Sequence, residues 1–103
     1  MTPSETAWRR VETEEMFRQA FADKVLISEG MRFTIHSDGR ISGRIGNSLL
    51  TGTWHWRDRY FCRTAALDGE GLGLDCEIIE MLGNQMRYTR DEGNGDTTVV
   101  FVE

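Results

Sequence analysis

The sequence predicts a mainly β protein, in which an N-terminal helix precedes an antiparallel up-and-down meander of about eight strands. From Lys24 onward, short apolar runs alternate with turn-forming pairs such as Asp38-Gly39 and Asn94-Gly95. Such pairs between apolar runs are the strongest local signal for hairpins. The chain has 103 residues, with eleven glycines and one proline. This length supports one modest hydrophobic core, so we expect a single domain over residues 1–103.

The segment before Lys24 predicts a helix over about residues 5–22. Thr13 suits an N-cap, and the two glutamates after it suit the first turn of a helix. Apolar residues follow at helical spacing, and the stripe extends back toward the N-terminus: Trp8, Val11, Phe17, Ala20 and Phe21. We expect this helix to cover one end or one face of the sheet.

Turn residues divide the rest of the chain into eight predicted strands, over residues 24–28, 31–36, 40–45, 49–56, 60–66, 73–81, 86–91 and 97–102. Connections this short make neighbouring strands antiparallel. Eight strands are enough to close, and closure removes exposed edges. We therefore predict a small closed or nearly closed barrel, with an open sheet packed on the helix as the alternative.

Turn lengths also predict which residues oppose one another. The predicted pairs are Ile35 with Ile41, Ile45 with Leu50, Trp56 with Tyr60, and Cys62 with Cys76. A slip of one residue would turn every side chain of a strand to the other face. This register predicts an inner face formed by Met31, Phe33, Ile35, Ile41, Ile45, Leu50, Trp54, Trp56, Tyr60, Cys62, Leu74, Cys76, Ile78, Tyr88 and Phe101. It predicts a solvated face formed by Arg32, Arg40, Arg44, Thr51, His55, Arg63, Glu77 and Arg87.

Charge and hydropathy exclude several classes of protein. The net charge is −5, with seven basic and three acidic residues over 24–65 and two basic and nine acidic residues over 66–103. We interpret this asymmetry as two halves of a sheet that neutralise each other. An acidic chain argues against nucleic-acid binding. No run approaches the roughly 20 apolar residues of a membrane span, and no apolar signal core is seen, so we expect no membrane association and a cytoplasmic location.

The two cysteines, Cys62 and Cys76, leave three interpretations open. Without an export signal we expect a reducing compartment, and therefore two free thiols packed in the core. A cross-strand disulfide is the second interpretation. A metal site is the third, although neither C-x-x-C nor H-x-x-x-H spacing occurs. We expect no metal and no cofactor.

The inner face supplies a candidate ligand site. Its predicted residues are Trp54, Trp56, Tyr60, Cys62, Cys76, Glu80, Tyr88 and Arg90. Large aromatic rings with a few polar groups are typical of small-molecule sites, although the same rings also suit a plain core. Glu80 and Arg90 share the parity of Ile78 and Tyr88, which predicts an inward ion pair that could anchor a ligand.

Four segments carry a resemblance to a family. They are residues 37–43 (SDGRISG), 52–56 (GTWHW), 60–63 (YFCR) and 75–76 (DC). Over about residues 17–102 the chain resembles small uncharacterised bacterial proteins that look like reduced lipocalins of the calycin type. The resemblance implies a small meander barrel with an internal ligand, and it implies no activity.

Motifs for catalysis are not found in the sequence. There is no P-loop, G-x-S-x-G or H-E-x-x-H, and the glycines of residues 69–73 lie between strands rather than opening a helix. The sequence favours a non-enzymatic barrel that binds a small apolar or aromatic molecule or a protein partner, as a monomer or homodimer. The alternatives are an enzyme with a polar site at the barrel rim, and an assembly protein that uses an exposed edge strand at 24–28 or 97–102.

Overall fold

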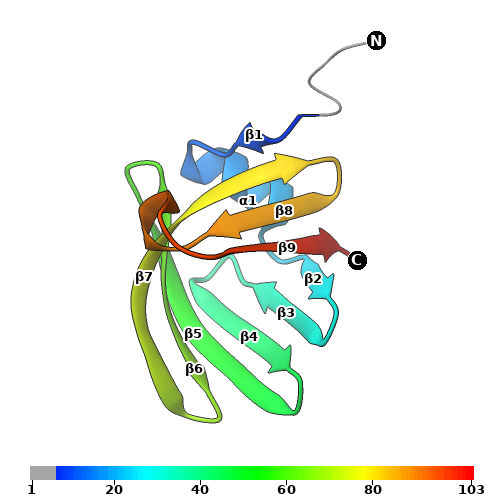
Figure 1. The fold of residues 1–103 in the computed structure, drawn as a ribbon, viewed down its shortest axis with the longest axis vertical. Helices are drawn as coiled ribbons and strands as arrows, with labels where there is room; N and C mark the ends of the chain where they lie inside the picture. The colour runs from blue at the N-terminus through cyan, green and yellow to red at the C-terminus, as the bar shows by residue number, and fades with distance from the viewer. Residues whose placement is uncertain (1–6) are drawn as a thin grey trace.

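The computed structural model describes residues 7–103 as an antiparallel eight-stranded barrel with one extra strand (Figure 1). The barrel strands are β2 (Val25–Ser28), β3 (Met31–Ile35), β4 (Arg40–Ile45), β5 (Ser48–Arg57), β6 (Tyr60–Leu67), β7 (Glu70–Leu82), β8 (Gln85–Thr89) and β9 (Thr97–Val102). Each strand from β2 to β8 pairs with the strand that follows it in the chain. A short 3-10 helix, η2 (Asp91–Gly93), lies between β8 and β9. Pairing of β2 with β9 closes the barrel. The closed form of the predicted meander is therefore confirmed.

Closure joins the two strands that the sequence suggested as free edges for assembly. Residues Val25–Ser28 of β2 pair with β3, and the same strand pairs with β9 through Ile27 and Phe101. The segment 97–102 pairs with β8 on its other side. The predicted free edge is therefore absent where β2 and β9 meet, at Leu26–Val102 and Ile27–Phe101, whereas residues 97–100 pair with β8 alone among the described residues.

The N-terminal helix is shorter than predicted. Helix α1 (Glu14–Phe21) begins after Thr13, whose side chain accepts a hydrogen bond of 3.2 Å from the Met16 amide. Before it, β1 (Arg9–Arg10) pairs with β7, and the Val11 amide donates to the Ile79 carbonyl at 2.8 Å. Sheet pairing therefore replaces the predicted helical turns before Thr13. Residues 5 and 6 of that prediction lie outside the described residues.

Helix α1 covers the upper end of the barrel in Figure 1. Phe17 and Phe21 of α1 are buried. The Phe17 ring centroid lies 5.2 Å from that of Trp54, 5.5 Å from that of Trp56 and 5.0 Å from that of Phe61. Contacts of this kind between large rings make burial at this end strongly favourable. The two tryptophans therefore face inward as predicted, and the helix occupies the space beside them.

The register is confirmed in β3–β4 and shifts further along the chain. Ile35 lies opposite Ile41 as predicted, whereas Ile45 lies opposite Ser48 rather than Leu50. That shift of two residues preserves the face of every side chain. A different error occurs between β5 and β6.

The turn between β5 and β6 contains two residues, not the predicted three. Arg57 lies opposite Tyr60, and Asp58 takes the left-handed conformation with φ 55°. Two-residue hairpin turns require such positive φ values, which aspartate tolerates better than most residues. The difference of one residue inverts the face of β6 and, through the β6–β7 pairing, the face of β7.

Several predicted side-chain orientations are therefore wrong. Phe61 and Glu77 are buried, whereas Leu74 and Phe101 are exposed. The residues whose predicted and observed faces differ are Tyr60, Cys62, Arg63, Leu74, Cys76, Glu77, Ile78, Glu80 and Phe101. The inner face of β6 and β7 carries Phe61, Arg63, Ala65, Glu77 and Ile79 instead.

Cys62 and Cys76 are opposed as predicted, and they form a disulfide. Their Cα atoms lie 4.0 Å apart, which brings the two sulfur atoms within bonding distance across the strand pair. The Nη2 atom of Arg57 lies 3.4 Å from the Cys76 sulfur. The expectation of two free thiols is therefore wrong.

Candidate ligand-binding site

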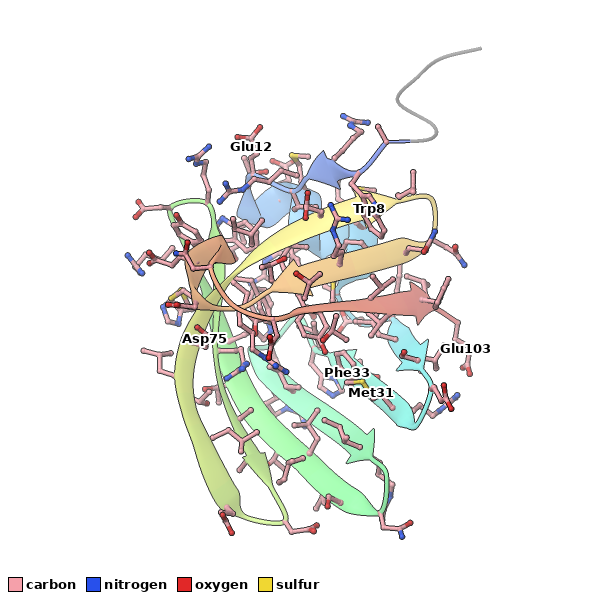
Figure 2. All side chains as sticks on the ribbon, in the orientation of Figure 1. Trp8, Glu12, Met31, Phe33, Asp75 and Glu103 are labelled. Carbon is pink, nitrogen blue, oxygen red and sulfur yellow. A yellow bond between two sulfur atoms is a disulfide. The ribbon has the colours of Figure 1, made fainter. Side chains whose placement is uncertain are left out.

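A half-open cavity of about 90 Å³ lies inside the barrel. Its lining includes Ile45, Leu50 and Leu72, which lie near the β4–β5 and β6–β7 hairpins. These hairpins are at the end of the barrel away from α1 (Figure 1). Met31 and Phe33 of β3, which contribute to its wall, lie below β9 in Figure 2. The apolar part of the wall consists of Met31, Phe33, Ile35, Ile41, Ile45, Leu50, Phe61, Ala65, Leu72 and Met86, and the polar part of Arg63, Glu77, Tyr88 and Arg90.

Glu77 is the buried acidic group of this cavity, with a relative exposure of 3%. Its Oε2 atom lies 3.3 Å from Nη2 of Arg63, but it accepts no hydrogen bond of good geometry from the described residues. Burial raises the pKa of Glu77 to about 7. The cations of Arg63 and Arg90 oppose this rise, and the carboxylate of Asp75 adds to it. Glu77 therefore exchanges its proton near neutral pH.

Arg63 and Arg90 lie on either side of this carboxyl group in the sheet order. Arg63 on β6 is largely buried, lies within 3.9 Å of Asp75 and donates to the Gly73 carbonyl. Arg90 follows the end of β8, where its own carbonyl accepts hydrogen bonds from the amides of Gly93 and Gly95. Its Nε atom is buried and has no hydrogen-bond partner in the part of the chain that the structure describes. The site thus holds two cations, of which Arg90 has a buried donor without a partner among the described residues.

Tyr88 completes the polar wall. It is buried on β8, and burial raises the pKa of its hydroxyl group. The hydroxyl therefore stays protonated at neutral pH and can donate or accept a hydrogen bond.

The structure separates the residues of the predicted site into three groups. Tyr88 and Arg90 line the cavity, as the prediction requires. Trp54 and Trp56 pack against Phe17 of α1 instead of lining it. The remaining four residues, Tyr60, Cys62, Cys76 and Glu80, lie on the other face of the strands.

The predicted ion pair of Glu80 with Arg90 does not form. Glu80 accepts a hydrogen bond of 2.9 Å from Nε of Arg87, its cross-strand neighbour on the outer face. Tyr60 likewise has an outer partner, because the Arg10 guanidinium lies 5.3 Å from the centre of its ring.

Sequence reasoning missed Arg63 and Glu77, which it assigned to solvent. A two-residue turn at Asp58-Arg59 was the signal that could have placed them correctly. With that turn, Phe61 and Arg63 share the face of Trp54 and Trp56. The predicted pairing of Cys62 with Cys76 then turns Glu77 inward as well.

Comparison of the chain with protein-family models, with curated proteins and with solved structures found no match in any of the three. Over residues 7–103, no helix combines the length and the apolar character needed to cross a membrane. The same residues contain no group of three or more histidine, cysteine or acidic side chains placed to hold a metal ion. Fold and site together define a small closed antiparallel barrel with a charged, half-open cavity among its described residues.

Proposed function

We propose that this barrel binds a small, mostly apolar molecule in its cavity, as a reduced lipocalin-like module. The observation that carries the proposal is the cavity itself, whose wall is apolar apart from a few convergent polar groups. Ligand sites in proteins commonly have this composition, and the mouth of a β-barrel is a common place for them. Because α1 covers one end, the ligand enters from the hairpin end.

The size of the cavity limits the ligand. Its volume of about 90 Å³ is smaller than the roughly 150 Å³ of an apolar cavity that holds benzene, but its open side lets part of a ligand project into water. Each buried methylene group contributes about 0.8 kcal/mol. A short alkyl chain therefore gains about 4 kcal/mol, which corresponds to a dissociation constant on the order of 1 mM.

Hexanamide, a neutral amide with a short alkyl chain, provides a direct test. We expect it to shift the NMR signals of cavity residues such as Leu50, Ala65 and Tyr88, with millimolar affinity. Ala65→Leu fills part of the cavity and should weaken binding on the order of tenfold, since contacts with about two methylene groups are lost. Ala66→Leu is the matched control, because Ala66 pairs with Thr51 on the alternate face of β6.

Two results would contradict this proposal. One is the absence of shifts at the cavity residues at any attainable concentration of hexanamide. The other is equal binding by the Ala65→Leu and Ala66→Leu variants, which would place the amide elsewhere on the protein.

An enzyme with a polar site at the barrel rim is the second candidate. It is favoured by Glu77, because a carboxyl group with a pKa of about 7 can act as a general acid or base near neutral pH. The other polar groups that line the cavity beside it are Arg63, Tyr88 and Arg90. An enzyme would convert its ligand, whereas a binding module returns it unchanged, and NMR spectra of recovered ligand distinguish the two.

A further inference from the structure

We propose that the natural ligand carries a carboxylate head group, which binds between Arg63 and Arg90 while Glu77 takes up one proton. The inference rests on the proposed function, because it specifies the chemistry of a ligand for the same cavity. No covalent bond forms or breaks in this step. The proton comes from solvent and stays on the Glu77 carboxyl group while the ligand is bound.

The balance of charge in the cavity supports an anionic ligand. Four charged groups meet here: Arg63 from β6, Asp75 and Glu77 from β7, and Arg90 from the end of β8. Tyr88 on β8 faces the same groups and is neutral. When Glu77 is protonated, two cations face a single carboxylate, so one positive charge is unbalanced. A bound monocarboxylate contributes one negative charge, which makes the net charge of the cavity zero.

Two buried polar atoms without partners support a carboxylate head group that accepts two hydrogen bonds. Nε of Arg90 is a buried donor, and Oε2 of Glu77 is a buried oxygen, and neither has a hydrogen-bond partner among the described residues. A buried polar group without a hydrogen-bond partner destabilises the folded protein. One carboxylate oxygen can accept from Arg90 while the other accepts from protonated Glu77, so a single head group satisfies both.

The small, largely apolar cavity favours a monoanion over a dianion. A phosphate group would leave excess negative charge beside Asp75 and Glu77, in surroundings where a buried unpaired charge is costly. We therefore infer a short-chain or otherwise compact monocarboxylic acid, whose apolar part lies against the wall formed by Met31, Ile45 and Leu50.

Paired titrations of the wild-type protein with hexanoate and hexanamide test the inference. Hexanoate is ionised throughout pH 6–8, and the fraction of protonated Glu77 falls about tenfold over this range for a pKa near 7. We expect hexanoate affinity, measured by NMR, to fall up to tenfold from pH 6 to pH 8, and hexanamide affinity to stay constant. In a pH-stat at pH 8, hexanoate binding should consume close to one proton per molecule bound, and hexanamide binding none.

Three variants assign the effect to particular side chains. Arg90→Gln should weaken hexanoate binding on the order of tenfold and weaken hexanamide binding much less, because only the carboxylate pairs with the guanidinium charge. Arg87→Gln is the matched control from the same part of the chain, because Arg87 pairs with Glu80 on the outer face. Glu77→Gln should bind hexanoate equally at pH 6 and pH 8.

The outcomes separate this inference from the proposed function. Hexanamide binding in the cavity, with hexanoate binding that is equally strong at pH 6 and pH 8 and consumes no proton, overturns the carboxylate head group but leaves the binding function intact. Failure of both probes to bind overturns the function itself.

Discussion

Replacing Glu77 with glutamine should stabilise the protein at pH 8 by on the order of 3 kcal/mol and leave its stability at pH 4 nearly unchanged. Burial raises the pKa of Glu77 from an ordinary 4.5 to about 7 in the folded protein. Between these values the folded state binds more protons than the unfolded state, so the free energy of unfolding falls as the pH rises. The slope is about 1.4 kcal/mol per pH unit and vanishes above pH 7. Glutamine has no proton to lose, so the variant lacks this slope.

Other carboxylates act in the opposite direction at acidic pH. Hydrogen bonds lower the pKa of Asp23, Asp38, Asp68 and Glu103, so their stabilising contributions are lost as the pH falls through and below their ordinary range. These contributions are common to the wild type and the variant, and they cancel in the difference between the two proteins.

Urea unfolding at several pH values between 4 and 8 measures this difference. Glu80→Gln serves as a control, because Glu80 is the next acidic residue of β7 and lies on the outer face beside Arg87. Parallel pH profiles for the wild type and Glu77→Gln would contradict the prediction and place Glu77 in contact with water.

Reduction of the Cys62–Cys76 disulfide should lower the free energy of unfolding by about 3 kcal/mol. The two cysteines are separated by 14 positions, and a bridge that closes a loop of this length restricts the unfolded chain by about that amount. For a domain of this size, 3 kcal/mol corresponds to a decrease in Tm on the order of 10–20 °C.

Thermal unfolding with and without a phosphine reductant measures this contribution. The Cys62→Ala, Cys76→Ala double variant is the control, and its Tm should not respond to the reductant. An unchanged Tm for reduced wild-type protein would show that the bridge contributes little to stability.

Much of the fold could be predicted because hydrophobic alternation and turn pairs act locally. All eight barrel strands overlap the ranges that the sequence predicts, and the Ile35–Ile41 register follows from the turn at residues 37–39. The helix could not be delimited, because apolar residues at helical spacing before Thr13 also suit a short strand. Pairing of Arg9 and Arg10 with β7 depends on a partner some 70 residues away.

The site was predicted only in part, and the reason is physical. Tyr88 and Arg90 follow from parity on β8, which does not depend on the β5–β6 turn. The sequence pattern predicts that the charged side chains of Arg63 and Glu77 lie in solvent. In the barrel both are largely buried and lie next to each other. Functional sites often bury charged side chains that local sequence rules assign to solvent. Here the length of the β5–β6 turn, two residues rather than three, decided which side chains of β6 and β7 face inward.

Direct titration of the Glu77 side chain tests the central claim that a carboxyl group is buried beside Arg63 and Arg90 in a ligand cavity. The ¹³C NMR signal of its carboxyl carbon should titrate with a midpoint of about 7 in the free protein. Saturation with hexanoate should raise that midpoint, because the added negative charge favours the protonated form. A midpoint near 4.5 that hexanoate leaves unchanged would contradict both the buried carboxyl group and the site.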